Sequence, residues 1–170
     1  MSGATGRPGR FLALGDSYTI GEGVDPDGRW PVLLARALRA DGRALDDPQI
    51  IATTGWTTDE LSAGIDAAAP QGPFALVGLL IGVNNQYRGR PLEEYRQQFG
   101  ELLERAIGFA GGRADRVLVL SIPDWGVTPF ARQSGRDLTQ VARELDAFNA
   151  IAREACDGRG LVIHVDPVDH

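Results

Sequence analysis

The sequence predicts a single α/β domain built on a mainly parallel five-stranded sheet with helices on both faces. Short apolar runs alternate with longer segments of helical periodicity along all 170 residues. Such nearly continuous apolar runs are typical of strands covered on both faces. Their alternation with helices implies right-handed crossovers, which place helices on both sides of the sheet. The predicted strands are Phe11–Leu14, Gln49–Ala52, Ala75–Ile81, Val117–Ile122 and Leu161–Val165.

Four amphipathic segments lie between the predicted strands. In the two longest, apolar residues recur at helical spacing and charged residues occupy the other face, so one face of each helix should pack on the sheet. The predicted helices are Trp30–Ala40, Thr58–Ala68, Leu92–Phe109 and Leu138–Cys156.

Composition and charge exclude several classes of protein. A net charge of −6 and a pI near 4.9 argue against a protein that binds nucleic acid through its phosphates. Residues 1–10 lack the apolar stretch of a secretory signal, and no apolar run approaches the roughly 20 residues of a membrane span. We therefore expect a cytoplasmic protein with one domain over residues 1–170, of which residues 1–9 are disordered.

The sequence also lacks the common signatures of cofactors and metals. Cys156 is the only cysteine, which excludes an internal disulfide, and its Ala-rich helical context suggests a buried apolar role. Neither a phosphate-binding loop nor a dinucleotide fingerprint is present, and neither is His-Glu-x-x-His or the Gly-x-Ser-x-Gly elbow. We expect a small-molecule substrate and neither a cofactor nor a metal.

Candidate catalytic residues follow the first three predicted strands. Open α/β sheets build their sites at the carboxyl ends of strands. There Ser17 follows Gly15 and Asp16, Gly55 follows the second strand, and Asn84 follows the third. The backbone N–H groups of Ser17 and Gly55 and the Asn84 amide would supply three donors beside a serine hydroxyl, as an oxyanion hole requires.

These blocks resemble the SGNH (GDSL-type) hydrolase family. The similarity covers Gly15-Asp16-Ser17, Gly55 and Gly82-x-Asn84, and it extends to the esterase and lysophospholipase branch through Ser17–Gly21 and Gly55–Thr58. The resemblance implies a flavodoxin-like three-layer fold and hydrolysis of a carboxylic ester through a serine acyl-enzyme. It implies Ser17 as nucleophile, with Ser17, Gly55 and Asn84 forming the oxyanion hole. One departure is Asn85, where the family often has Asp.

A second departure concerns the catalytic base. The family places an Asp-x-x-His motif after the last strand, but here Pro167 stands three residues before His170. By comparison with the family, Asp166 ends the last strand, and the catalytic loop and final helix would lie beyond the chain. A terminal His170 could still act as base, oriented by Asp166 or Asp169. Loss of that helix would leave an apolar sheet face uncovered, so we expect possible self-association.

Each candidate also has a structural interpretation. Ser17 could be a turn or N-cap serine, and Gly55 and Asn84 ordinary loop residues, so only their combination favours catalysis. His164 lies inside an apolar run and is expected to be a strand residue, and Asp124 a structural carboxylate. The alternative function is a non-catalytic SGNH-like binding module. A flavin-binding relative is disfavoured because no Ser/Thr-rich phosphate loop follows the first strand.

Overall fold

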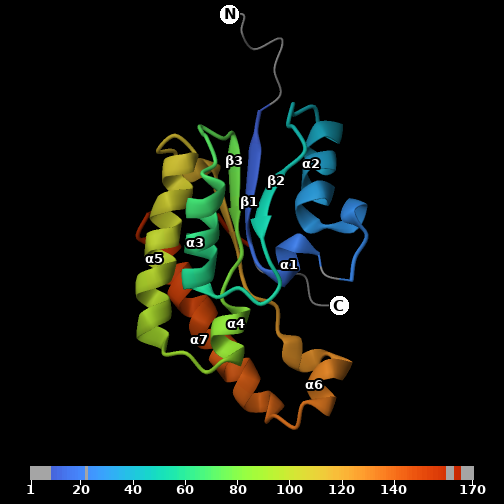
Figure 1. Cartoon of the computed structure of the whole chain (residues 1–170), viewed down its shortest axis with the longest axis vertical. Helices are drawn as coiled ribbons and strands as arrows, with labels where there is room; N and C mark the ends of the chain where they lie inside the picture. The colour runs from blue at the N-terminus through green and yellow to red at the C-terminus, as the bar shows by residue number, and fades with distance from the viewer. Residues whose placement is uncertain (1–8, 22, 160–162, 166–170) are drawn as a thin grey trace, which may run out of the picture.

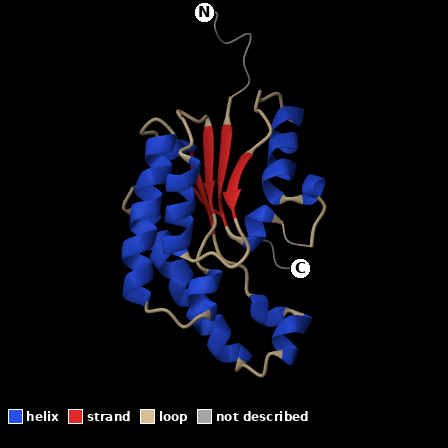
Figure 2. Ribbon diagram, viewed as in Figure 1, coloured by secondary structure: helices blue, strands red, loops and turns tan. Residues whose placement is uncertain are grey.

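The computed structural model describes residues 9–21, 23–159 and 163–165. They form a five-stranded parallel sheet in the order β2-β1-β3-β4-β5, with helices on both faces (Figures 1 and 2). Adjacent strands are joined by parallel pairing throughout. The strands are β1 (Phe11–Gly15), β2 (Gln49–Ala52), β3 (Leu76–Leu79), β4 (Val117–Leu120) and β5 (Ile163–Val165).

The long helices match the amphipathic segments of the sequence. Three have the predicted bounds, and the fourth extends one residue further, to Asp157. Short helices occupy the loops after β1, β3 and β4. The long helices are α2 (Trp30–Ala40), α3 (Thr58–Ala68), α5 (Leu92–Phe109) and α7 (Leu138–Asp157), and the short ones are α1 (Ser17–Ile20), α4 (Val83–Tyr87) and α6 (Pro129–Gln133).

Alternation along the buried strands divides the core between the two faces. In β1, Leu12 and Leu14 belong to the large cluster under α3, α5 and α7, whereas Phe11 and Ala13 belong to a smaller cluster under α2. Figure 1 shows α2 on one side of the sheet and α3 and α5 on the other. This division follows from the period of two along a strand, which sends successive side chains to opposite faces.

Several strand ends, and one residue expected to be disordered, differ from the prediction. β3 ends at Leu79 and β4 at Leu120, before the predicted ends at Ile81 and Ile122, although Leu80, Ile81 and Ile122 stay buried. Gly9, expected to be disordered, forms an isolated bridge with Leu45. The other residues of that predicted disordered segment, 1–8, lie outside the described part of the chain, as do residues 160–162.

The edge where the strands end carries the three short helices. In Figure 1 the strand arrows point downward, with α1 beside their tips and α4 and α6 below them. The loops that connect strands to helices at this edge bring residues from distant parts of the chain together. The candidate site must therefore be built from the loops after β1, β2, β3 and β4.

Candidate active site

Ser17 is fixed by the tight turn that joins β1 to α1. A Cβ atom on Gly15 would lie 2.2 Å from Thr19 Oγ1 and 2.8 Å from the Leu80 carbonyl oxygen, so only glycine fits there. Asp16 is the N-cap of α1, where its carboxylate accepts the Tyr18 N–H at 3.0 Å. Ser17 is thus the first residue of α1, and its N–H is free of the intrahelical bonding pattern.

Asp16 is an ionisable group in an almost water-free position. Its side chain is 1% exposed, and its second carboxylate oxygen has no hydrogen-bond partner among the described residues. Burial raises the pKa of Asp16 from 3.8 to about 7, although bonding to the Tyr18 N–H opposes the shift. Burial, with the nearby charges of Asp16 and Asp124, raises the pKa of Tyr18 to about 12.

Gly55 turns the chain between β2 and α3. Its φ of +90° lies in the left-handed region that favours glycine. The Arg88 guanidinium donates to the Gly55 carbonyl at 2.6 Å and forms a 3.2 Å ion pair with Glu60, so the carbonyl points to Arg88. Within the described residues, the Gly55 N–H makes no hydrogen bond, which leaves it available to a ligand.

Asn84, on α4 after β3, contacts the loop between β2 and α3. Gly82, with a φ of +134°, turns the chain into α4, and a Cβ there would lie 2.8 Å from the Tyr95 hydroxyl oxygen. The Asn84 amide donates to the Trp56 carbonyl at 3.0 Å. An amide NH₂ carries two hydrogens, so this bond orients Asn84 and still leaves one donor for an oxyanion.

Asn85 ties the two loops together a second time. It is fully buried, its amide oxygen accepts the Thr58 N–H at 3.1 Å, and its NH₂ donates to Thr58 Oγ1 at 2.9 Å. The amide can serve as acceptor and donor at once, which an ionised Asp cannot do. The departure from the family pattern is therefore accommodated by a complete local network.

These residues line one cavity of about 450 Å³. Ser17, Gly55 and Asn84 lie on it together, as the sequence predicted, and aromatic side chains form much of the remaining wall. Residues that carry a serine hydroxyl, unpaired backbone N–H groups and a side-chain amide thus share one mostly apolar cavity, a composition suited to nucleophilic attack on a carbonyl group. The lining residues are Ser17, Tyr18, Thr54, Gly55, Val83, Asn84, Tyr87, Trp125 and Phe130.

Other candidate residues do not join this cavity or lie outside the described residues. His170, Asp166 and Asp169 lie outside the residues that the structure describes. His164 is paired with Val119 in the sheet, as expected for a strand residue. Asp124 accepts the Gly126 N–H at 2.7 Å, which is a structural role.

Cys156 is a buried thiol that does not line the cavity. The thiol is buried, and burial raises its pKa to about 11, so it remains protonated and unreactive at neutral pH.

Within the described ranges, no group of three or more His, Cys, Asp or Glu residues could hold a metal ion. In the same ranges, no helix is long and apolar enough to cross a membrane.

Two contributors to the site were missed by sequence analysis. Arg88 holds the Gly55 carbonyl, and Gln86 accepts the Trp125 indole N–H at 2.8 Å. Gln86 directly follows the Asn84-Asn85 pair on α4, and Arg88 is the C-cap of that helix. Their proximity in sequence was the available signal, but the five-residue helix that orients them is too short to show periodicity.

Comparison with solved structures finds a similar fold in TesA and in two esterases. The structure titled TesA superposes with a TM-score of 0.67 at 21% identity, covering 88% of this chain and 73% of that one. The psychrotrophic esterase EstA from Pseudoalteromonas sp. gives 0.68 at 16% identity over 94% and 77% of the two chains. AlinE4, an SGNH-hydrolase family esterase, gives 0.66 at 24% identity over 95% and 77%.

Comparison with family models identifies the chain. A search among proteins of curated function returned no match. The model of the GDSL-like lipase/acylhydrolase family matches residues 13–169, which is nearly the whole chain and includes Ser17, Gly55 and Asn84. The chain therefore belongs to the GDSL-like lipase/acylhydrolase family and is an ester-hydrolysing enzyme.

Proposed function

We propose that the protein hydrolyses carboxylic esters through an acyl-enzyme on Ser17. The observation that carries the proposal is the convergence of Ser17, Gly55 and Asn84 on one cavity from three separate loops. The strand order, which is that of flavodoxin-like doubly wound folds, supports the three-layer fold that this family implies.

In the first half of the reaction, Ser17 Oγ bonds to the ester carbonyl carbon and passes its proton to a base. The carbonyl oxygen becomes an oxyanion that accepts from the Ser17 and Gly55 N–H groups and from the free Asn84 hydrogen. The base then gives its proton to the departing alkoxide, which leaves as an alcohol and yields the acyl-enzyme. Water repeats the sequence and releases the carboxylic acid. His170 is the proposed base, with Asp166 as the carboxylate that orients it.

Apolar side chains on the cavity wall suggest where the acyl group lies. Tyr18, Val83, Trp125 and Phe130 face the same space as the proposed nucleophile. Trp125 is held in place by its indole bond to Gln86 and by ring contacts at 5.6 Å to Tyr87 and 6.0 Å to Phe130. A rigid aromatic wall favours a short acyl chain or a ring over a charged acyl group.

The test is the hydrolysis of p-nitrophenyl butyrate by the wild type and by Ser17→Ala and His170→Ala variants. Loss of the nucleophile should lower kcat by a factor on the order of 10⁶, as in other serine hydrolases. Ser62→Ala, a serine variant on α3 away from the cavity, is the matched control and should retain activity. A wild-type rate no higher than that of Ser17→Ala would refute the proposed activity. Wild-type activity in His170→Ala would refute only the assignment of the base.

A further inference from the structure

The most exposed large apolar side chains surround the mouth of the candidate active site. Val127 is 71% exposed and Phe130 is 61% exposed, more than any other large apolar side chain in the described ranges. Phe130 also lines the cavity that contains Ser17, as does the half-exposed Tyr87. Exposed apolar clusters of this kind commonly mark a surface that contacts another apolar phase.

The exposed side chains are held by a well-bonded segment. Thr128 caps α6 by accepting the Ala131 N–H at 3.3 Å, and its hydroxyl donates to the Trp125 carbonyl at 2.6 Å. Trp125 is itself buried and anchored to Gln86. Because both ends of the turn are fixed to buried groups, the exposure of Val127 and Phe130 is a feature of the folded state.

Positive charge accompanies the apolar side chains. Arg132 on α6 and Arg136 just after it are exposed and form no ion pair within the described residues. The Arg136 guanidinium lies 4.0 Å from the centre of the Tyr87 ring and donates to the Tyr87 carbonyl at 2.8 Å. The flanking acids, Asp124 and Asp137, are engaged as acceptors of backbone N–H groups.

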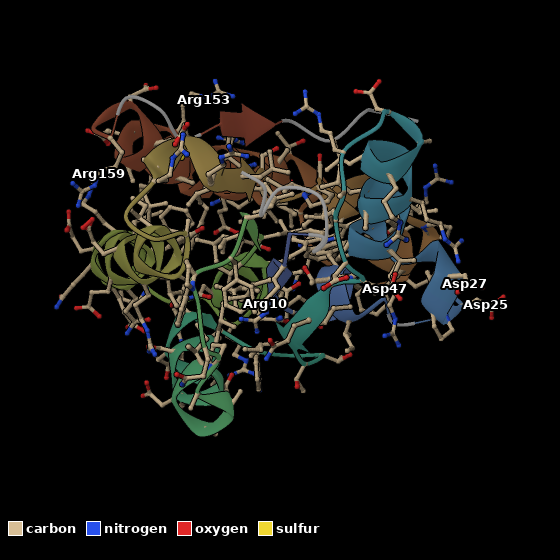
Figure 3. All side chains as sticks on the ribbon, turned by 90° about the horizontal axis from the view of Figure 1, so that it is seen from above. Arg10, Asp25, Asp27, Asp47, Arg153 and Arg159 are labelled. Atoms are coloured by element: carbon tan, nitrogen blue, oxygen red, sulfur yellow. The ribbon has the colours of Figure 1, made fainter. Side chains whose placement is uncertain are left out.

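Several charged side chains elsewhere on the molecule are paired. Figure 3, seen from the end opposite the short helices, shows Asp27, Asp47 and Arg159 extending outward. Asp27 is paired with Arg36 at 3.2 Å, Asp47 with Arg39 at 3.1 Å, and Arg159 with Glu104. The two arginines at the cavity mouth add exposed positive charge, without an ion pair among the described residues, beside the apolar side chains of a protein whose net charge is −6.

We propose that Tyr87, Val127, Phe130, Arg132 and Arg136, here called the mouth surface, dock the protein on an anionic lipid surface. The apolar tips would enter the acyl boundary while the guanidinium groups bind anionic headgroups. This occupant fits better than a protein, because a protein seated on the mouth surface would block the cavity, whereas a lipid layer can deliver an ester into it. This proposal rests on the proposed function in one respect, namely that the cavity beside the mouth surface is the active site.

Flotation with vesicles of ether-linked phospholipids tests docking without any hydrolysable carboxylic ester. Wild-type protein should bind vesicles of equal phosphatidylglycerol and phosphatidylcholine and bind pure phosphatidylcholine weakly. Val127→Ser and Arg132→Gln should each weaken binding about five- to tenfold. Leu33→Ser, an exposed apolar position on α2, and Arg116→Gln, an exposed arginine on the η3 turn (Ala114–Arg116), are the matched controls and should change binding little.

Hydrolysis of a soluble ester separates this proposal from the proposed function. Val127 and Arg132 do not line the cavity, so their variants should hydrolyse p-nitrophenyl butyrate at the wild-type rate. Absence of vesicle binding, equal loss in the control variants, or equal binding to neutral vesicles would each overturn the proposal, whatever the esterase result. A dimer that Val127→Ser dissociates, without vesicle binding, would assign the mouth surface to a second copy of the chain.

Discussion

Replacing Asp16 by Asn should stabilise the protein above neutral pH. In the unfolded chain this carboxyl group loses its proton near pH 3.8, whereas in the folded chain burial raises its pKa to about 7. Between these values the folded state binds more protons than the unfolded state, so the free energy of unfolding falls as the pH rises. The contribution is fully present below pH 3.8 and lost above pH 7.

The magnitude follows from the size of the shift. About three pKa units at roughly 1.4 kcal/mol each amount to about 4 kcal/mol, an upper value for the cost of ionising Asp16 in the folded protein. Asn has the same shape as the protonated acid and retains an oxygen to accept the Tyr18 N–H. It should therefore remove the cost without removing the cap.

Urea denaturation of the wild type and of Asp16→Asn at pH 4, 6 and 8 measures the effect. The two proteins should have similar free energies of unfolding at pH 4, and the variant should become more stable by up to about 4 kcal/mol at pH 8. Asp124→Asn is the matched control, since Asp124 also accepts an N–H two residues along but is exposed. A stability difference between wild type and Asp16→Asn that does not grow with pH would refute the reasoning.

Two further predictions concern the amide donor and the second sheet face. Asn84→Ala should lower kcat for p-nitrophenyl butyrate by a factor of about 10²–10³, because one donor to the oxyanion is lost. The melting temperature should change little. An unchanged kcat would show that Asn84 is not part of the oxyanion hole. Leu118 and Leu120 alternate with the buried residues of β4, are only half-buried and belong to neither core cluster. The protein should therefore self-associate at high concentration, and a Leu118→Ser/Leu120→Ser variant should sediment closer to the monomer, whereas a monomeric wild type at every concentration would contradict this.

Secondary structure was predictable where burial imposes a pattern. The bounds of α5 are those predicted from the spacing of its apolar residues, because one face of that helix packs on the sheet. The strands were found as apolar runs for the same reason. The ends of β3 and β4 were predicted too far along the chain, because Leu80 and Ile122 lie beyond the strand ends and are still buried.

The site was predictable only in part. Ser17, Gly55 and Asn84 follow directly after strands, so the topology alone brings them to one edge. Loop aromatic residues such as Tyr87, Trp125 and Phe130 were identifiable from the sequence as possible pocket lining, and they do line the cavity. The contact of Arg88 with Gly55 could not be foreseen, because the five-residue helix α4 before it is too short to show a periodic pattern. Interactions between loops depend on where the loops meet, which local sequence does not encode.

The paired asparagines after β3 have a consequence for engineering. Asn84 binds the Trp56 carbonyl, and Asn85 binds the N–H and the hydroxyl of Thr58, so the loop after β2 is held to the loop after β3 at two successive positions. Neither loop can be exchanged for a homologous one without leaving buried amide groups unpaired on the other. A graft intended to alter specificity would therefore have to transfer both segments together as one cassette.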